Sequence, residues 1–113
     1  MVVGYRNIDA KNHDSQTALH LASYYGHVEI LESLVRARAR VNLADSDGYS
    51  PLHYAAMADK PAALRVLLEQ GGANPTMRNE QVNRWVPLHE AAHRGHIDCV
   101  ATLLEFHSPS KPR

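Results

Sequence analysis

Three tetrapeptides decide the fold of this chain: Thr17-Ala18-Leu19-His20, Ser50-Pro51-Leu52-His53 and Val86-Pro87-Leu88-His89. Their histidines lie 33 and then 36 residues apart. The residues downstream of each histidine repeat at the same offset, as shown by the pairs of small residues Ala22-Ser23, Ala55-Ala56 and Ala91-Ala92. Apolar pairs close each unit: Leu34-Val35, Leu67-Leu68 and Leu103-Leu104. So many coincidences indicate an internal repeat, and a period of this length is typical of a stacked array.

The period and the tetrapeptide resemble the ankyrin repeat, whose unit carries T-P-L-H-x-A at about 33 residues. The resemblance covers residues 8–105. It implies an all-α fold, an ankyrin-repeat solenoid of stacked helix-turn-helix units with hairpin-like loops. First helices are predicted near 18–25, 51–58 and 87–94. Second helices are predicted near 28–36, 61–70 and 97–106.

The residues supply a physical reason for these boundaries. Thr17 and Ser50 stand where a hydroxyl caps the N–H groups of the following helix. A proline at the first helical position loses no hydrogen bond there, which suits Pro51 and Pro87. Glycines at the C-terminal cap are expected to end two first helices, at Gly26 and Gly95. Apolar residues at helical spacing form the predicted seam: Leu31, Leu34, Leu64, Leu67, Val100 and Leu103.

Departures from the pattern are informative as well. Val86 replaces the capping hydroxyl residue of the third unit, which by typical magnitudes costs about 1 kcal/mol. Asp59-Lys60-Pro61 replaces Gly-His in the second unit and is expected to force a different turn between its helices, with Pro61 opening the second helix. Three extra residues separate the second and third units. One lies in the doubled Gly71-Gly72 and two lengthen the loop 77–85.

Aligning the copies divides the chain into five segments. We predict the tail of a preceding repeat (1–15), three repeats (16–45, 46–80 and 81–107) and a polar C-terminal tail (108–113). The first helix pair offers four large apolar residues with nothing obvious to cover one side: Leu19, Leu21, Ile30 and Leu31. Because terminal units of a solenoid need a polar outer face, we expect a piece of a longer array. A natural three-repeat protein with an imperfect cap is the alternative.

The net charge and the cysteine count indicate which class of partner and which cellular setting to expect. Twelve basic and twelve acidic side chains cancel, which gives no electrostatic footprint for nucleic acid or for a membrane surface. Cys99 is the only cysteine, which favours a reducing, cytoplasmic or nuclear setting. We expect it to be a buried small hydrophobe. We expect another protein as the partner, with no cofactor and no small molecule, and a monomer or weak self-association through uncapped ends.

One stretch matches a zinc motif. His89-Glu90-Ala91-Ala92-His93 fits H-E-x-x-H, in which two histidines bind zinc and the glutamate activates water. The register favours a structural role, because His89 is the third copy of His20 and His53. In the family this histidine hydrogen-bonds the loop backbone around the turn. A third ligand at a recognised spacing is also lacking, so a zinc site at His89 and His93 is only a remote alternative.

The resemblance implies a non-catalytic protein-interaction module that binds through a concave face of hairpin tips and first helices. Ten residues map onto that face by register: Tyr49, Trp85, Tyr24, Tyr25, Met57, His93, Arg94, Arg84, Asp47 and Gln16. Trp, Tyr and Arg dominate the energies of protein interfaces. Tyr49 and Trp85 occupy the same position in adjacent units and are predicted to lie about 10 Å apart. Packing of Tyr24 or Tyr25 between units is the competing interpretation.

The end of the chain carries a second, narrower likeness. Residues 85–104, WVPLHEAAHRGHIDCVATLL, followed by a proline-bearing tail, resemble the repeats of SH2–ankyrin tyrosine kinases. This likeness suggests an alternative context, a non-catalytic regulatory ankyrin segment of a larger signalling protein.

Overall fold

The computed structural model describes residues 7–107 and contains six helices within that range. They are α1 (Ala18–Tyr25), α2 (Val28–Arg36), α3 (Pro51–Met57), α4 (Pro61–Glu69), α5 (Pro87–Arg94) and α6 (Ile97–His107). Their bounds agree with the prediction to within one residue at each end. The predicted tail 108–113, and residues 1–6 of the predicted opening segment, lie outside the described residues.

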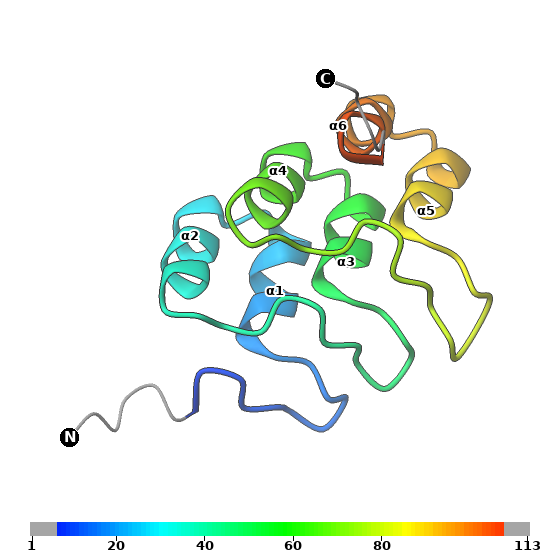
Figure 1. Cartoon of the computed structure of the whole chain (residues 1–113). Helices are drawn as coiled ribbons and strands as arrows, with labels where there is room; N and C mark the ends of the chain where they lie inside the picture. Colours follow the sequence, from blue (N-terminus) through cyan, green and yellow to red (C-terminus); the bar gives the residue numbers. More distant parts are fainter. Residues whose placement is uncertain (1–6, 108–113) are drawn as a thin grey trace.

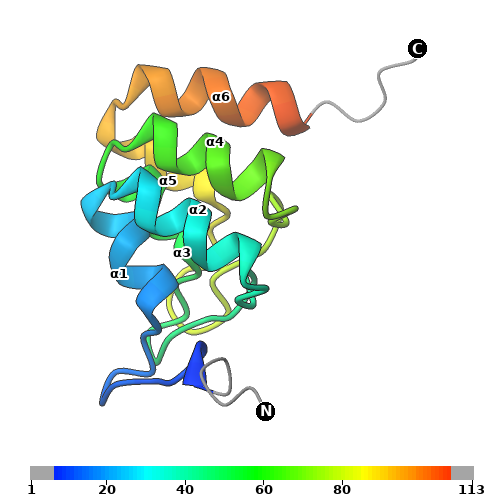
Figure 2. The same cartoon turned by 90° about the vertical axis from the view of Figure 1, so that its left-hand side faces the viewer.

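The helices form two layers, because each unit contributes one helix to each layer. The inner layer contains α1, α3 and α5, and the outer layer contains α2, α4 and α6 (Figure 1). Loops 37–50 and 70–86 return from the outer layer and project beyond the inner one as hairpins (Figures 1 and 2). None of the helices in residues 7–107 is long and apolar enough to cross a membrane.

The tetrapeptide builds the start of each first helix. The hydroxyl oxygen of Thr17 accepts from His20 N at 3.4 Å, and Ser50 does the same for His53 N at 3.2 Å. In return, each histidine Nδ1 accepts from the backbone N–H of the cap residue, at 3.0 Å for Thr17 and 3.2 Å for Ser50. The predicted caps are therefore present, as reciprocal capping boxes.

The third unit keeps only half of this arrangement. Val86 has no side-chain acceptor, so the N-terminus of α5 lacks the hydroxyl cap, as the sequence predicted. His89 Nδ1 nevertheless accepts from Val86 N at 3.0 Å. The histidine side of the box thus persists without the hydroxyl.

The other ring nitrogen of His20 and His53 ties one unit to the next. His20 Nε2 donates to Tyr49 O at 3.0 Å, and His53 Nε2 donates to Trp85 O at 2.8 Å. Both acceptors belong to the hairpin of the following unit. Because Nδ1 accepts and Nε2 donates, the neutral imidazole satisfies every contact. Both rings are fully buried.

The turn inside the second unit corrects one expectation. Asp59 adopts a left-handed conformation, with φ of 60°, close to the 72° of Gly26 and the 74° of Gly95. The backbone N–H that follows reaches back to the first helix with the same bond length in all three units: His27 N to Ala22 O, Lys60 N to Ala55 O and His96 N to Ala91 O, each 2.9 Å. The turn is therefore the same, because aspartate tolerates the left-handed region better than most residues. Pro61 opens α4, as predicted.

The core lies between the two layers and consists largely of leucine and alanine. Cys99 is completely buried, and its thiol lies 3.9 Å from Ala55 O. Burial raises the pKa of this thiol to about 12, so it is an inert thiol at neutral pH. The prediction that Cys99 acts as a small buried hydrophobe is confirmed.

The expectation for the first helix pair was half wrong. Leu19 and Leu31 are buried and belong to the hydrophobic core. Leu21 and Ile30 remain 42% and 52% exposed, as expected. At the other end of the described array, Ile97 and Leu104 are similarly exposed.

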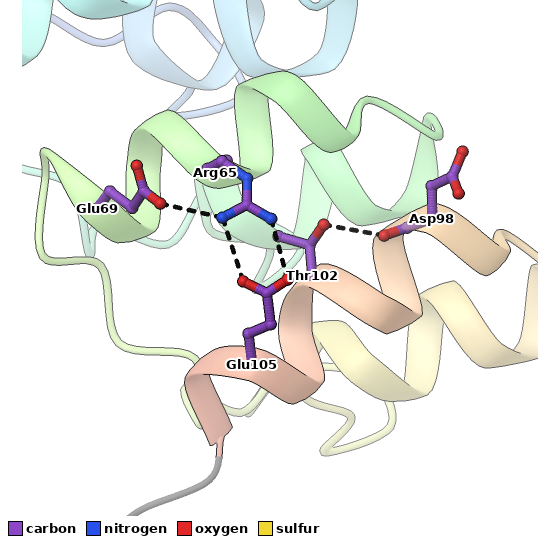
Figure 3. A network of polar contacts seen from close by, with 5 residues as sticks. All are labelled: Arg65, Glu69, Asp98, Thr102 and Glu105. Carbon is purple, nitrogen blue, oxygen red and sulfur yellow. Dashed lines mark hydrogen bonds and ion pairs between the residues drawn. The ribbon is translucent and has the colours of Figure 1, made fainter. Parts of the chain in front are cut away.

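The outer layer carries a charged contact between its second and third helices. The Arg65 guanidinium on α4 donates to both oxygens of Glu105 on α6, each at 3.2 Å, and to Glu69 at 3.0 Å (Figure 3). All three side chains are exposed, so water screens the attraction and the network adds little stability. Its geometry is consistent with the register in which α6 packs on α4.

The missing cap yields a stability prediction. Val86→Thr should supply the acceptor that α5 lacks while keeping the branched shape of the side chain. We expect the free energy of unfolding to rise by about 1 kcal/mol, measured by urea denaturation. Val86→Ala is the control, because it also changes the buried valine but offers no acceptor, and it should lower stability. Equal stability of Val86→Thr and the unchanged chain would contradict this account of the cap.

The buried histidines yield a prediction for pH. Burial lowers the pKa of His20 and His53 below 6.5, although the carbonyl each ring contacts acts in the opposite direction. The unfolded chain therefore binds these protons at a higher pH than the folded chain does. The free energy of unfolding should be at its full value above about pH 6.5 and should fall as the pH drops below it. Urea denaturation at about pH 7.5 and about pH 5.5 measures the loss, which should be smaller in His53→Ala.

Candidate functional site

The hairpins place three side chains in equivalent positions along the array. Each hairpin is closed by one backbone bond, from Asn12 N to Gln16 O, Asp45 N to Tyr49 O and Asn79 N to Trp85 O. The three acceptor residues directly precede the cap residue of the next first helix. Gln16, Tyr49 and Trp85 are therefore structurally matched, as the register predicted, and all three are half-buried.

Four tyrosines of the first two units form a continuous row of ring contacts. Tyr25 and Tyr24 meet edge to face with ring centroids 5.0 Å apart. Tyr24 meets Tyr54 in the same way at 5.8 Å, and Tyr54 lies 5.6 Å from Tyr49. Tyr24 and Tyr25 are 42% and 59% exposed. Tyr24 thus packs against the next unit, as the competing interpretation held, and it still presents much of its ring to solvent.

Sequence reasoning missed Tyr54, which links the two units. Its phenol donates to the carboxylate of Asp45, and it accepts from Gln16 Nε2 at 3.0 Å. Burial, together with the bond to Asp45, raises the pKa of Tyr54 well above its ordinary value. The signal was its register: Tyr54 directly follows the tetrapeptide, where the other units carry Leu21 and Glu90.

The buried carboxylate of Asp45 organises the second hairpin. Its Oδ1 accepts from Asp47 N at 3.0 Å and from Tyr49 N at 2.9 Å, while Oδ2 accepts from Tyr54. These three hydrogen bonds satisfy a carboxylate that is 6% exposed. The position of the Tyr49 ring is therefore set by the backbone of its own hairpin.

A small cavity of about 240 Å³ opens beside the tyrosine row. Its lining comprises Gln16, His20, Leu21, Tyr24, Tyr25 and Tyr54. The structure therefore brings three of the ten predicted residues together at one depression: Gln16, Tyr24 and Tyr25. The wall is mostly aromatic and apolar, with the Gln16 amide and the tyrosine hydroxyls as its polar groups.

Trp85 forms a second aromatic cluster, in the third unit. Its ring lies 6.0 Å from His89 and 5.2 Å from His93. Arg94 reaches the buried carboxylate of Glu90 at 3.7 Å. Gln16 joins the tyrosine row through its hydrogen bond to Tyr54. Four predicted residues are joined to neither aromatic cluster by a ring contact or a hydrogen bond to one of its rings: Arg94, Met57, Arg84 and Asp47. Of these, Met57 is half-buried and the other three are exposed.

The geometry of His89 bears on the zinc motif. Its Nδ1 accepts from Val86 N, which is the same contact that His20 and His53 make at their own caps. Glu90, the residue the motif would use to activate water, is 2% exposed and pairs with Arg94. Within residues 7–107, no group of three potential ligands lies close enough together to hold a metal ion.

The repeated capping box, the histidine bridge and the two-layer stack define a class of protein, and sequence comparison agrees with it. The family model described as Ankyrin repeats (3 copies) matches residues 3–79, and the Ankyrin repeat model matches residues 83–112. This chain belongs to the ankyrin repeat family. Ankyrin repeats are protein-interaction units without catalytic activity of their own.

Several individual proteins are similar to this chain. The chain is 49% identical over 110 residues to Tyrosine-protein kinase Shark of Drosophila melanogaster, which covers 97% of this chain and 12% of that protein. It is 35% identical over 107 residues to Tyrosine-protein kinase HTK16 of Hydra vulgaris, covering 95% of this chain and 14% of that protein. Inversin of Homo sapiens is 36% identical over 104 residues, or 89% of this chain and 10% of that protein. The chain therefore spans only a small part of the length of these relatives.

Proposed function

We propose that this chain binds a partner protein through the face made by its hairpins and first helices. We name this the aromatic face and define it by Tyr24, Tyr25, Tyr49, Tyr54 and Trp85. The observation that carries the proposal is the row of four tyrosine rings, because contacts with neighbouring rings hold large side chains in fixed positions while leaving part of each exposed.

Such an arrangement favours binding for two physical reasons. Tyrosine and tryptophan bury a large area on contact and keep a polar group for hydrogen bonding. Side chains that are already ordered lose little rotational freedom when a partner arrives, so less of the contact energy is spent on ordering them. Asp47, Arg84 and Arg94 are exposed on the hairpins and first helices and would provide charge at the rim of this face.

The comparisons support a second, wider proposal about the protein that contains this chain. Identity of 49% across nearly the whole chain favours a non-catalytic regulatory segment of a tyrosine kinase. A cytoplasmic or nuclear location is part of the same proposal and rests on the single, buried cysteine. Sequencing the complete transcript tests the kinase context, since a kinase domain should follow in the same reading frame. A transcript without one would overturn it.

The aromatic face yields a binding prediction. Trp85→Ala and Tyr25→Ala should each weaken capture of the partner by about tenfold or more, which is typical for truncation of a central aromatic residue. Affinity capture from a lysate, quantified by mass spectrometry against the unchanged chain, gives the set of proteins lost with each variant. The thermal midpoint of each variant should stay close to that of the unchanged chain, because both side chains are partly exposed.

A control on the opposite layer makes the result specific. Ala62 is exposed on α4, so Ala62→Arg places a bulky charge on the outer layer without touching the aromatic face. This variant should capture the same proteins as the unchanged chain. If Ala62→Arg loses the captured proteins while Trp85→Ala and Tyr25→Ala retain them, the binding face lies on the outer layer and the proposal is wrong.

A further inference from the structure

Three arginines alternate with alanines at the C-terminal end of α2 and directly after it, at positions 36, 38 and 40. All three are exposed. Within residues 7–107 none of them forms an ion pair, whereas Arg65 and Arg94 both do. In a chain whose charges cancel, this segment is a local concentration of unpaired positive charge.

The backbone of Arg38 is strained, and the second unit has a glycine at the matching position. Arg38 has φ of 71°, a left-handed conformation that L side chains disfavour. The matching residue of the second unit is Gly72, with φ of 64°. The match follows from the next residue, since Ala39 N donates to Leu34 O and Ala73 N donates to Leu67 O, both at 3.0 Å. The first unit thus keeps an arginine where a glycine would fit without strain, and strain of this kind clusters at binding sites.

A cavity of about 470 Å³ lies between this segment and the end of α4. Its lining comprises Val35, Arg38, Ala39, Arg40, Val41, Gln70 and Gly71. The C-terminal ends of α2 and α4 lie on the same side of the molecule, at the right of Figure 2. The cavity therefore lies beside the outer layer and involves none of the residues that define the aromatic face.

Gly71 packs against the apolar part of this cavity wall. The second unit has one more residue here than the first, Gly71, so the chain makes a wider turn after α4. A Cβ on Gly71 would lie 2.9 Å from Leu67 O, 3.1 Å from Val41 Cγ1 and 3.5 Å from Val35 Cγ2, so only glycine allows this close approach. Val35 and Val41 are half-buried, and the surface that they keep lines the cavity beside Arg38 and Arg40.

We propose that this cavity binds a phosphorylated tyrosine side chain of a partner peptide. The ring would lie on Val35 and Val41, and the phosphate would accept hydrogen bonds from Arg38 and Arg40. Guanidinium groups bind phosphate in a bidentate geometry, and an aromatic ring gains free energy when it covers apolar surface. The proposal goes beyond the proposed function, because it concerns a different face and a different kind of recognition.

Two other anions fit the cavity less well. A phosphorylated serine carries no ring, so the valines would stay exposed. A flat anionic membrane would approach acidic side chains together with the arginines. Glu32 accepts from Gln70 at 3.2 Å at the edge of the cavity, and Asp9 accepts from Arg40 N at 3.0 Å. A single phosphate group presents less negative charge to those carboxylates than a whole membrane surface does.

The test uses N-acetyl-phosphotyrosine amide as the probe and nuclear magnetic resonance titration as the measurement. We expect the backbone amide signals of Arg38, Arg40 and Gly71 to shift on binding. Affinity should exceed that for inorganic phosphate and for N-acetyl-phosphoserine amide by about tenfold, because only the first probe carries the ring. Equal affinity for all three would overturn recognition of the ring and leave a general anion site. Binding to vesicles of phosphatidylserine and phosphatidylcholine without binding of the probe would assign the segment to membranes instead.

Arg38→Gly separates binding from folding. It removes the charge and supplies the residue that the second unit already uses, so the thermal midpoint should hold or rise while affinity for the probe falls by about tenfold. Arg40→Gln, which leaves the backbone unchanged, should weaken binding similarly. Arg78→Gln is the control, since it removes one charge from the third hairpin and should leave affinity unchanged. Full affinity in Arg38→Gly and Arg40→Gln would overturn the proposal.

Discussion

One imidazole ring in each of the first two units serves two hydrogen-bond partners, and the stacking of the array depends on it. Nδ1 accepts at the cap of its own first helix, while Nε2 of His20 and His53 donates to the hairpin of the next unit. The same ring that caps a helix therefore also fixes where the following hairpin must lie. Because both rings are buried and neutral, their protonation opposes folding. Tyr49 and Trp85 supply the two acceptor carbonyls, so the histidine ladder also positions their side chains.

The two sides of the solenoid carry different side chains because the helices are connected by different kinds of loop on each side. On the hairpin side, each loop is closed by a bond across its base and braced by an Asn or Asp side chain, which leaves ordered aromatic residues at the edge of the inner layer. On the other side, the ends of α2 and α4 lead into turns whose length and sequence differ between units. Arg38 and the doubled glycine both fall in these turns. The length and sequence of these turns can differ because they lie outside the histidine ladder, although each turn keeps one buried alanine, Ala39 or Ala73.

Sequence periodicity predicted the helices well because each position could be compared with the equivalent positions of the other units. Six helices, the hydroxyl caps, the glycine caps and the burial of Cys99 all follow from a residue occupying a position that at least one other unit also displays. The expectations that rested on residue type alone were wrong. Asp59 was expected to change the turn, yet the backbone keeps the same hydrogen bond, because aspartate reaches the left-handed region that glycine occupies elsewhere. Leu19 and Leu31 were grouped with Leu21 and Ile30, although the first pair is buried in the core and the second is exposed.

The sequence by itself determined the repeat, the helix boundaries and the matched positions of Gln16, Tyr49 and Trp85 in the hairpins. These depend on bonds between residues close in the chain, and their spacing can be read directly. Only the tertiary structure decided which side chains meet across units: Tyr54 bridging to Gln16, the run of tyrosine rings, and the cavity between the arginine segment and Gly71. Those contacts join residues some 30 to 40 positions apart, as the bond from Gln16 to Tyr54 shows with a separation of 38. They depend on how far one unit is translated and rotated against the next, which packing sets and the pattern of residues does not.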